Sequence, residues 1–153
     1  MNVAMGISED IQQNEFTGIY HKSLINLIYT SNHIIYKANT FFKKYGLTRQ
    51  QYNVLRILRS QSDAGASVNL IKNRMLDKMS DASRIVERLR VKGLVVRKQD
   101  PEDRRAVTVM ITDNGVALLD KMDGSVNVLE EDFRKLSAEE ADLLNELLDR
   151  LRD

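Results

Sequence analysis

Two adjacent arginines, Arg104 and Arg105, stand in the densest run of charge in this chain of 153 residues. Residues 100–105 read DPEDRR, so that five of the six are charged, and the segment contains the only proline. Asp-Pro favours a turn, and a turn exposes its arginines to water or to a partner. A guanidinium group on a thin turn fits the narrow, strongly negative minor groove of DNA, and Asp103 is spaced to hold Arg105 extended. The alternative is a charged turn that is only solvated.

A predicted helix that begins at Ser80 carries the second group of candidate residues. Its apolar side follows helical spacing and comprises Ala82, Ile85, Val86 and Leu89. Its polar side presents Ser80, Ser83 and Arg84 near the N-terminus and Arg88 one turn further on. Hydroxyl and guanidinium groups there suit the base edges of a major groove, and the helix dipole favours nearby phosphates. The alternative is an ordinary surface helix, whose outer face is polar in any protein.

The elements around these two groups follow from apolar periodicity, helix caps and turn residues. Thr48 and Ser137 each begin a capping box that Gln51 and Glu140 complete, and Gly46 is placed to end the first helix. A polar loop is expected over residues 60–67. The predicted elements are helices at about 16–45, 48–59, 69–76, 80–92, 112–131 and 137–151, and strands at 94–99 and 106–111. This order predicts a mainly α fold with a small β-hairpin wing, an α+β arrangement built on a winged helix-turn-helix.

Charge is distributed unevenly along a chain whose net charge is only +1. Residues 70–112 carry eleven basic and six acidic side chains, whereas residues 113–153 carry five basic and twelve acidic ones. The middle of the chain therefore attracts polyanions such as DNA, and the C-terminal part repels them. Solvated helix faces that happen to differ in charge are the alternative.

Length and composition predict a single domain, 1–153, located in the cytoplasm. Cysteine is absent, which excludes disulfides and cysteine-based redox switches, and no membrane span or secretory signal is visible. The two histidines, His21 and His33, lack the spacing of a metal pair, and no phosphate loop or nucleophile motif is present. We therefore predict no metal, no cofactor and no enzymatic activity. Met75, Met79 and Met110 are expected to fill core space and not to sense oxidation.

Several linked motifs resemble the MarR family of bacterial winged-helix regulators. They are the recognition-helix pattern SRIVERL at 83–89, KGLV at 92–95, the wing DPEDRR at 100–105 and TDNG at 112–115. The motifs occur in the family's order, and the resemblance extends over nearly the whole chain from about residue 16. It implies a sequence-specific transcriptional regulator, and a repressor in particular, that binds a pseudo-palindromic operator in double-stranded DNA as a homodimer.

The resemblance also assigns parts of the chain to these tasks. Residues 48–111 would form the DNA-binding winged helix-turn-helix lobe, and residues 16–45 and 113–153 would form the helical dimerisation lobe. By position, contacts of the recognition helix and wing with DNA fall on Ser80, Asp81, Ser83, Arg84, Arg88, Asp103, Arg104 and Arg105. The minor-groove arginine matches Arg105, with Arg104 meeting phosphate. Asp81 either accepts a hydrogen bond from cytosine or caps its own helix, and the cap is the interpretation we favour.

Control by a small ligand is a further implication of the resemblance. Family members are commonly released from DNA by small ligands, often aromatic acids, that bind where the two lobes meet. The pocket for an aromatic or phenolic effector of this kind could be lined by Tyr20, His33, Tyr36, Tyr52 and Arg56. The alternative is that these are core and interface side chains. The alternative function is a winged-helix module that binds protein and not DNA. The two wing arginines favour DNA, because a wing that binds protein does not need arginines for a minor groove.

Overall fold

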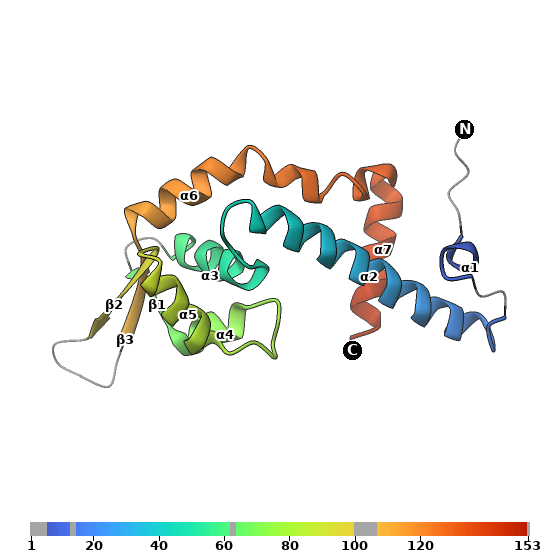
Figure 1. Ribbon diagram of the computed structural model, residues 1–153. Helices are drawn as coiled ribbons and strands as arrows, with labels where there is room; N and C mark the ends of the chain where they lie inside the picture. The colour runs from blue at the N-terminus through green and yellow to red at the C-terminus, as the bar shows by residue number, and fades with distance from the viewer. Residues whose placement is uncertain (1–5, 13–14, 62–63, 100–106, 153) are drawn as a thin grey trace. The chain divides into compact units, whose positions relative to one another are not determined.

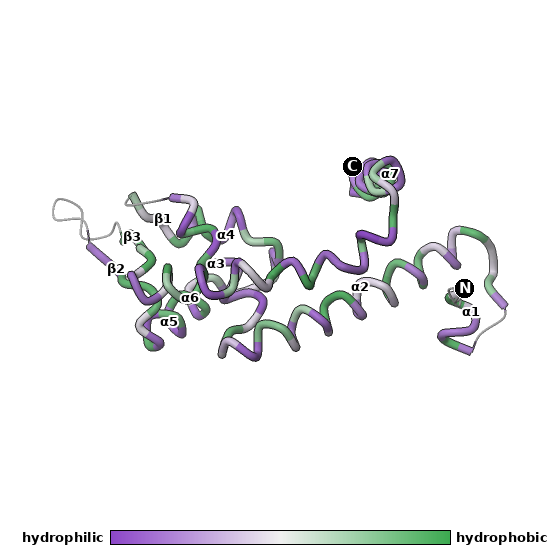
Figure 2. Tube along the Cα trace, turned by 90° about the horizontal axis from the view of Figure 1, so that it is seen from above, coloured by the Kyte–Doolittle hydropathy of each residue, from purple (hydrophilic) through white to green (hydrophobic). Residues whose placement is uncertain are grey.

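The computed structural model describes residues 6–12, 15–61, 64–99 and 107–152, and it contains two compact units, Met1–Thr40 and Phe41–Asp153 (Figure 1). The first unit holds the short helix α1 (Ile7–Asp10) and most of the long helix α2 (Ile19–Lys43). Hydrophobic residues recur along α2 (Figure 2). The large apolar side chains that α2 exposes are Ile19, Tyr20, Leu24, Leu27, Ile28, Tyr29 and Tyr36.

The second unit is built around helix α3 (Arg49–Arg59), which lies against helices α4 (Val68–Arg74), α5 (Ala82–Val91) and α6 (Asp113–Asp123) and against strand β3 (Val107–Ile111). These elements share one hydrophobic core. Its most completely buried side chains are Val54, Leu55, Leu58, Ile71, Met75, Val86, Leu89, Val95, Val109, Leu119 and Met122. Ala66 of the short strand β1 (Ala66–Ser67) is buried in the same core, so the helices and the sheet fix one another's positions.

The start of α3 confirms the capping box predicted at Thr48. The Thr48 hydroxyl accepts a hydrogen bond from the backbone N–H of Gln51, and the Gln51 side-chain oxygen accepts one from the backbone N–H of Thr48, each at 3.1 Å. Gly46, just before this cap, has a φ of 68°, which a glycine adopts without strain. The chain therefore turns sharply from α2 into α3.

Three antiparallel strands form a small sheet in the order β1-β3-β2. The predicted hairpin is confirmed as β2 (Val95–Gln99) and β3, with Gln99 opposite Val107. The polar loop expected over residues 60–67 was wrong in part, because Ala66–Ser67 forms β1 and pairs with β3. A strand of two residues has no alternation of polar and apolar side chains from which to predict it.

The helix predicted for residues 112–131 ends earlier than expected. Thr112 caps it as predicted, but α6 stops at Asp123 and Gly124 follows as its C-cap. Glycine and serine at 124 and 125 are poor helix formers, and two 3-10 turns follow, η2 (Val126–Leu129) and η3 (Phe133–Lys135). The capping box at Ser137 then opens α7 (Ala138–Arg150), as predicted.

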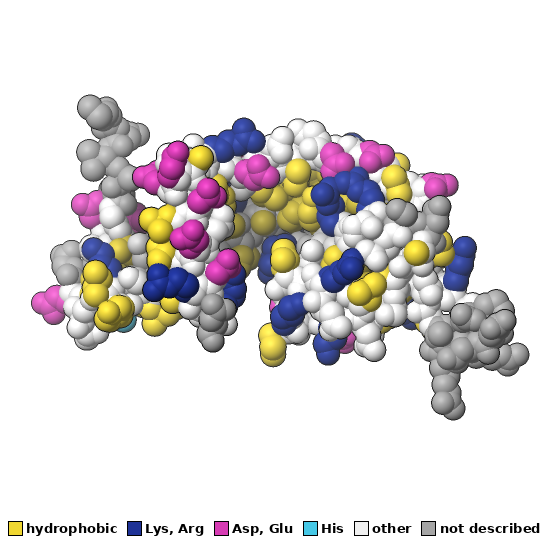
Figure 3. Space-filling view, turned by 180° about the vertical axis from the view of Figure 1, so that it is seen from behind, with side chains coloured by type: hydrophobic (Ala, Val, Ile, Leu, Met, Phe, Trp, Pro, Cys, Tyr) yellow, Lys and Arg dark blue, Asp and Glu magenta, His cyan; other side chains and the backbone are white. Residues whose placement is uncertain are grey.

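Helix α7 presents an apolar row to solvent. Leu143, Leu147 and Leu151 are all exposed, and acidic side chains lie beside the hydrophobic ones on this helix (Figure 3). An amphipathic helix that leaves its leucines exposed lacks a partner for its apolar face.

Candidate nucleic-acid interface

Helix α5 is held by one side and free on the other. Ala82, Val86 and Leu89 are buried where α5 lies against α3, α4 and β2. Ser83 and Arg84 are exposed near the N-terminus of the helix. Because the apolar stripe fixes the orientation of α5, these two side chains must point away from the core, as predicted.

The N-terminus of α5 lies one residue later than predicted. Asp81 is the N-cap, and its Oδ1 atom accepts a hydrogen bond from the backbone N–H of Arg84 at 3.1 Å. The favoured interpretation of Asp81 is thus confirmed, whereas Ser80 lies before the helix and does not open it. Serine and aspartate are both good N-caps, so the sequence alone offered two adjacent candidates.

The turn before α5 is organised by Asp77, a residue that the sequence did not single out. Its carboxylate accepts hydrogen bonds from the Gln50 side chain at 3.3 Å and from the backbone N–H of Met79 at 3.1 Å. A hydrogen bond from the hydroxyl of Ser80, and then these two bonds, lower the pKa of Asp77. Asp77 is therefore ionised at neutral pH, and it ties the turn to the first turn of α3.

Met79 departs from what the sequence predicted. Met75 is 1% exposed and fills core space as expected, but Met79 is 95% exposed, so its assignment to the core was wrong. Met110 is half-buried. The apolar periodicity that predicts burial applies within helices and strands, and Met79 lies in a turn, where it does not apply.

Shallow hollows flank the N-terminus of α5 on two sides. One, of about 280 Å³, is lined by Thr48, Gln50, Ser80, Asp81, Arg84, Ile85 and Arg88. The other, of about 460 Å³, lies toward α4 and is lined in part by Lys72, Lys78, Ser80 and Ser83. The structure thus brings together the five residues predicted on the recognition helix, and it adds two lysines and the start of α3 to them.

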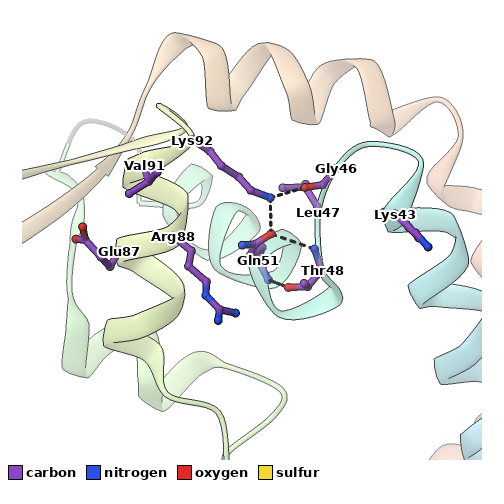
Figure 4. A pocket seen from close by; sticks show the side chains of 9 residues that line it. All are labelled: Lys43, Gly46, Leu47, Thr48, Gln51, Glu87, Arg88, Val91 and Lys92. Atoms are coloured by element: carbon purple, nitrogen blue, oxygen red, sulfur yellow. Dashed lines mark hydrogen bonds between the residues drawn. The ribbon is translucent and has the colours of Figure 1, made fainter.

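A third and larger hollow, of about 580 Å³, lies between the C-terminal half of α5 and the chain that enters α3 (Figure 4). Lys92 reaches across it to the carbonyl oxygen of Gly46 and, at 3.1 Å, to the side-chain oxygen of Gln51. Arg88 lines both this hollow and the smallest one, and in Figure 4 it extends from α5 toward the first turn of α3. Arg88 is therefore directed along the protein surface, toward the start of α3.

The base of the hairpin is joined to α5 by Arg97 on β2. Its guanidinium group donates a hydrogen bond to the carbonyl oxygen of Ser83 at 3.3 Å and lies 3.5 Å from the carboxylate of Glu87. A hydrogen bond from Arg90 lowers the pKa of Glu87, which therefore stays ionised between the two arginines. The hairpin base and the candidate recognition helix are thus held as one surface.

The predicted wing residues Asp103, Arg104 and Arg105 lie outside the residues that the structure describes. The strands on either side of them are paired up to Gln99 and Val107. Their roles at the minor groove stay predictions.

The five candidate ligand residues are divided between the two units. Tyr20, His33 and Tyr36 lie on α2 in the first unit, and Tyr52 and Arg56 lie on α3 in the second. The ring of Tyr52 stacks on Phe42 with 4.4 Å between centroids, and its burial raises the pKa of its hydroxyl.

Arg56 also has a partner within the second unit. It donates to the carboxylate of Asp123 at 3.1 Å, and Arg59 donates to the same carboxylate, which lowers the pKa of Asp123. These ion pairs join α3 to α6. Tyr52 thus packs as the alternative interpretation expects, whereas Arg56 is exposed and forms an ion pair, and a ligand role stays a prediction for both.

The described ranges contain no group of three or more histidine, aspartate or glutamate side chains that could hold a metal ion. No described helix is both long enough and apolar enough to cross a membrane.

Comparison with known proteins gives consistent matches. Residues 45–106 match the model of the MarR family. The chain is 30% identical over 114 residues to the HTH-type transcriptional regulator MhqR of Bacillus subtilis, a match that covers 74% of this chain and 77% of MhqR.

Solved structures agree with these matches. A MarR transcription factor from Planctomyces limnophilus is 32% identical, with a TM-score of 0.67, over 90% of this chain and 98% of that one. A structure described as showing how 6-hydroxynicotinic acid regulates DNA binding by BpsR of Bordetella bronchiseptica is 24% identical. It has a TM-score of 0.73 over 92% of this chain and 97% of that one, and it shows a shared fold.

Proposed function

The chain belongs to the MarR family of transcriptional regulators, and we propose that it represses transcription by binding a pseudo-palindromic operator as a homodimer in the cytoplasm. The relatives it matches are named as transcriptional regulators and not as enzymes. Repression is the direction we propose because a protein that occupies an operator excludes other proteins from the same DNA.

One observation carries the proposal of DNA binding. Helix α5 is anchored by its buried stripe and presents Ser83 and Arg84 beside a capped N-terminus, with lysines at 72 and 78 around the adjoining hollow. An N-terminal helix end that offers a hydroxyl and a guanidinium group suits base edges in a major groove, and the cations around it suit the flanking phosphates. We propose the further contacts of the wing on the sequence pattern 100–105.

The homodimer is supported by two apolar faces. The exposed apolar side chains of α2 and the exposed leucines of α7 would be buried by a second copy, and the family resemblance assigns both helices to dimerisation. Two copies would place two recognition helices on successive major grooves of one face of the DNA.

Release by a small aromatic or phenolic effector is the part of the proposal supported by relatives. BpsR is described as regulated in its DNA binding by 6-hydroxynicotinic acid, which is an aromatic acid. If such a ligand weakens operator binding by this protein, operator DNA must weaken ligand binding by the same factor.

The function is tested by fluorescence anisotropy with the DNA upstream of the protein's own gene, titrated with salt, and by in vitro selection from random duplexes. We expect specific binding that falls steeply with salt. A Ser83→Ala/Arg84→Ala variant should lose specificity, whereas Lys121→Ala, which removes a positive charge from the exposed side of α6, should not. Binding that shows no preference for any duplex over competitor DNA would contradict the proposal. A reporter gene placed behind the selected site tests the direction of regulation.

A further inference from the structure

The turn between α4 and α5 exposes the side chain of Met79 on a backbone that is held by hydrogen bonds. The backbone N–H of Met79 is bonded to the Asp77 carboxylate, and the N–H of the next residue, Ser80, donates to the Asp77 carbonyl oxygen at 3.3 Å. The Met79 side chain itself is 95% exposed. The turn therefore constrains where the thioether chain starts and leaves the chain itself free to reach a partner.

The surroundings of Met79 indicate the chemistry of that partner. Met79 lines the 460 Å³ hollow together with Lys72, Lys78 and the recognition-helix residue Ser83. The Lys78 ammonium group donates to the carbonyl oxygen of Asn73, while Lys72 is exposed. The apolar side chain of Met79 thus lies beside two lysines and next to Ser83, whose hydroxyl we propose to contact a base edge.

DNA is a partner that supplies both kinds of group at once. Its phosphates match the lysines, and the one apolar group on the base edges of the major groove is the C5 methyl group of thymine. Methionine is unbranched and polarizable, so it adapts its shape to such a group. We propose that Met79 determines specificity by contacting a thymine methyl group in each half-site, beside the base pairs contacted by Ser83 and Arg84.

This inference rests on the proposed function, and its test starts from the duplex that the wild-type protein selects in vitro. Uracil replaces each thymine of that duplex in turn, which removes the methyl group and keeps the hydrogen-bonding pattern. We expect one thymine per half-site at which uracil weakens wild-type binding about fourfold, the factor that burying about one methyl group supplies. Met79→Ala removes the contact from both half-sites at once, so it should bind the thymine duplex about sixteenfold more weakly, which is about fourfold for each half-site, and it should show no further loss with uracil at that position.

Two further variants separate the thymine contact from a general effect on the turn. Met79→Leu keeps an apolar side chain and should keep a preference for thymine. Leu76 is in the same turn, is 79% exposed and does not line the hollow, so Leu76→Ala should keep the wild-type ratio of thymine to uracil affinity. The melting temperature of each variant checks that the fold is retained, which we expect because neither side chain is buried.

The outcomes are distinguishable. A wild-type protein that selects a specific duplex but is indifferent to uracil everywhere overturns this inference and leaves the proposed function intact. The same holds if uracil weakens binding by Met79→Ala as much as it weakens binding by the wild type. It also holds if Leu76→Ala abolishes the preference for thymine over uracil. A wild-type protein that selects no duplex at all overturns both.

Discussion

Arg84 and Arg88 lie one turn apart on α5, but the structure gives them different surroundings. Both side chains are exposed and line the hollow beside Thr48, but Arg88 also lines the larger hollow and extends toward the first turn of α3 (Figure 4). A guanidinium group directed outward can bond to the edge of a guanine, and one directed along the protein surface is placed for a phosphate. We therefore expect the two arginines to have separable roles in DNA binding, although the sequence pattern presents them alike.

Removing these arginines one at a time should produce two different signatures. Arg84→Ala should cost about 1–3 kcal/mol of binding free energy and relax the preference at one base pair per half-site. Arg88→Ala should weaken binding to all sequences about equally and reduce the slope of log K against log[salt] by about 1 per contact. Anisotropy titrations on the selected duplex and its single-base variants measure both. A base-specific loss in Arg88→Ala would show that this arginine contacts a base after all.

The predicted contact of Arg105 with the minor groove can be tested by replacing Asp103, the acid that is expected to position it. Arg105→Ala should weaken binding most on operators with A·T-rich flanks, where the minor groove is narrow and its potential deepest. Asp103→Ala should weaken binding in the same way, although it removes a negative charge, because it frees the guanidinium group. Gel-shift assays on operators that differ only in their flanks measure this. Tighter binding by Asp103→Ala together with normal binding by Arg105→Ala would mean that the turn is only solvated.

At the scale of elements, the end of the sheet and the start of α6 pack closely against each other. Thr112 donates its hydroxyl to the carbonyl oxygen of Gly93 at 2.8 Å and its backbone N–H to that of Leu94 at 3.1 Å. Gly115, in the first turn of α6, is buried, and a Cβ atom there would collide with the Leu94 carbonyl oxygen and the side chain of Ile111. The absence of a side chain at 115 therefore allows α6 to start directly from β3.

Gly115→Ala should accordingly destabilise the protein by about 1–3 kcal/mol, the usual cost of forcing extra volume into a packed site. Urea denaturation, with the midpoint and slope fitted together, measures the change. Gly124→Ala is the matched control, since no atom would lie within 4 Å of its added Cβ and its φ of −69° suits alanine. Equal stability of the two variants would mean that α6 shifts at little cost.

The elements that the sequence predicted best are those with a local cause. Capping boxes at Thr48 and Ser137 and the glycine after α2 place helix ends through contacts between residues three or four apart, and the structure confirms them. Strand β1 was not predicted because it forms by pairing with a strand that is distant in sequence. The end of α6 was placed too late because the apolar residues beyond Gly124 continue a helical spacing.

The candidate site shows the same division between local and distant causes. The exposed positions of Ser83 and Arg84 follow from the periodicity of α5 itself. The role of Asp77 depends on Gln50, which is 27 residues away, and the link from Arg97 to Ser83 spans 14 residues. A single sequence does not reveal such pairs, because the period of one helix or strand does not say which distant element it packs against.

At the scale of the whole molecule, the sign of charge changes where β3 ends. The basic stretch 70–112 forms α5, the hairpin and most of α4, and the acidic stretch 113–153 forms the elements from α6 to α7. Nonspecific attraction to DNA therefore acts on the part of the chain that carries the candidate recognition helix, and the acidic part is repelled. Charge thus orients the protein before any base is contacted.

The exposed leucines of α7 lead to the prediction for the assembly. The protein should sediment as a dimer at low micromolar concentration, with a melting temperature that rises with protein concentration, because dissociation would be coupled to unfolding. Leu147→Glu places a charge in the apolar row and should shift the protein toward monomer and weaken operator binding. Asn145→Glu adds the same charge to an exposed position on another side of α7 and should change neither. Analytical ultracentrifugation of the three proteins decides between the alternatives. If Leu147→Glu remained a dimer with full affinity, α7 would lie outside the interface, and a wild-type monomer that bound a two-half-site operator with full affinity would contradict the homodimer itself.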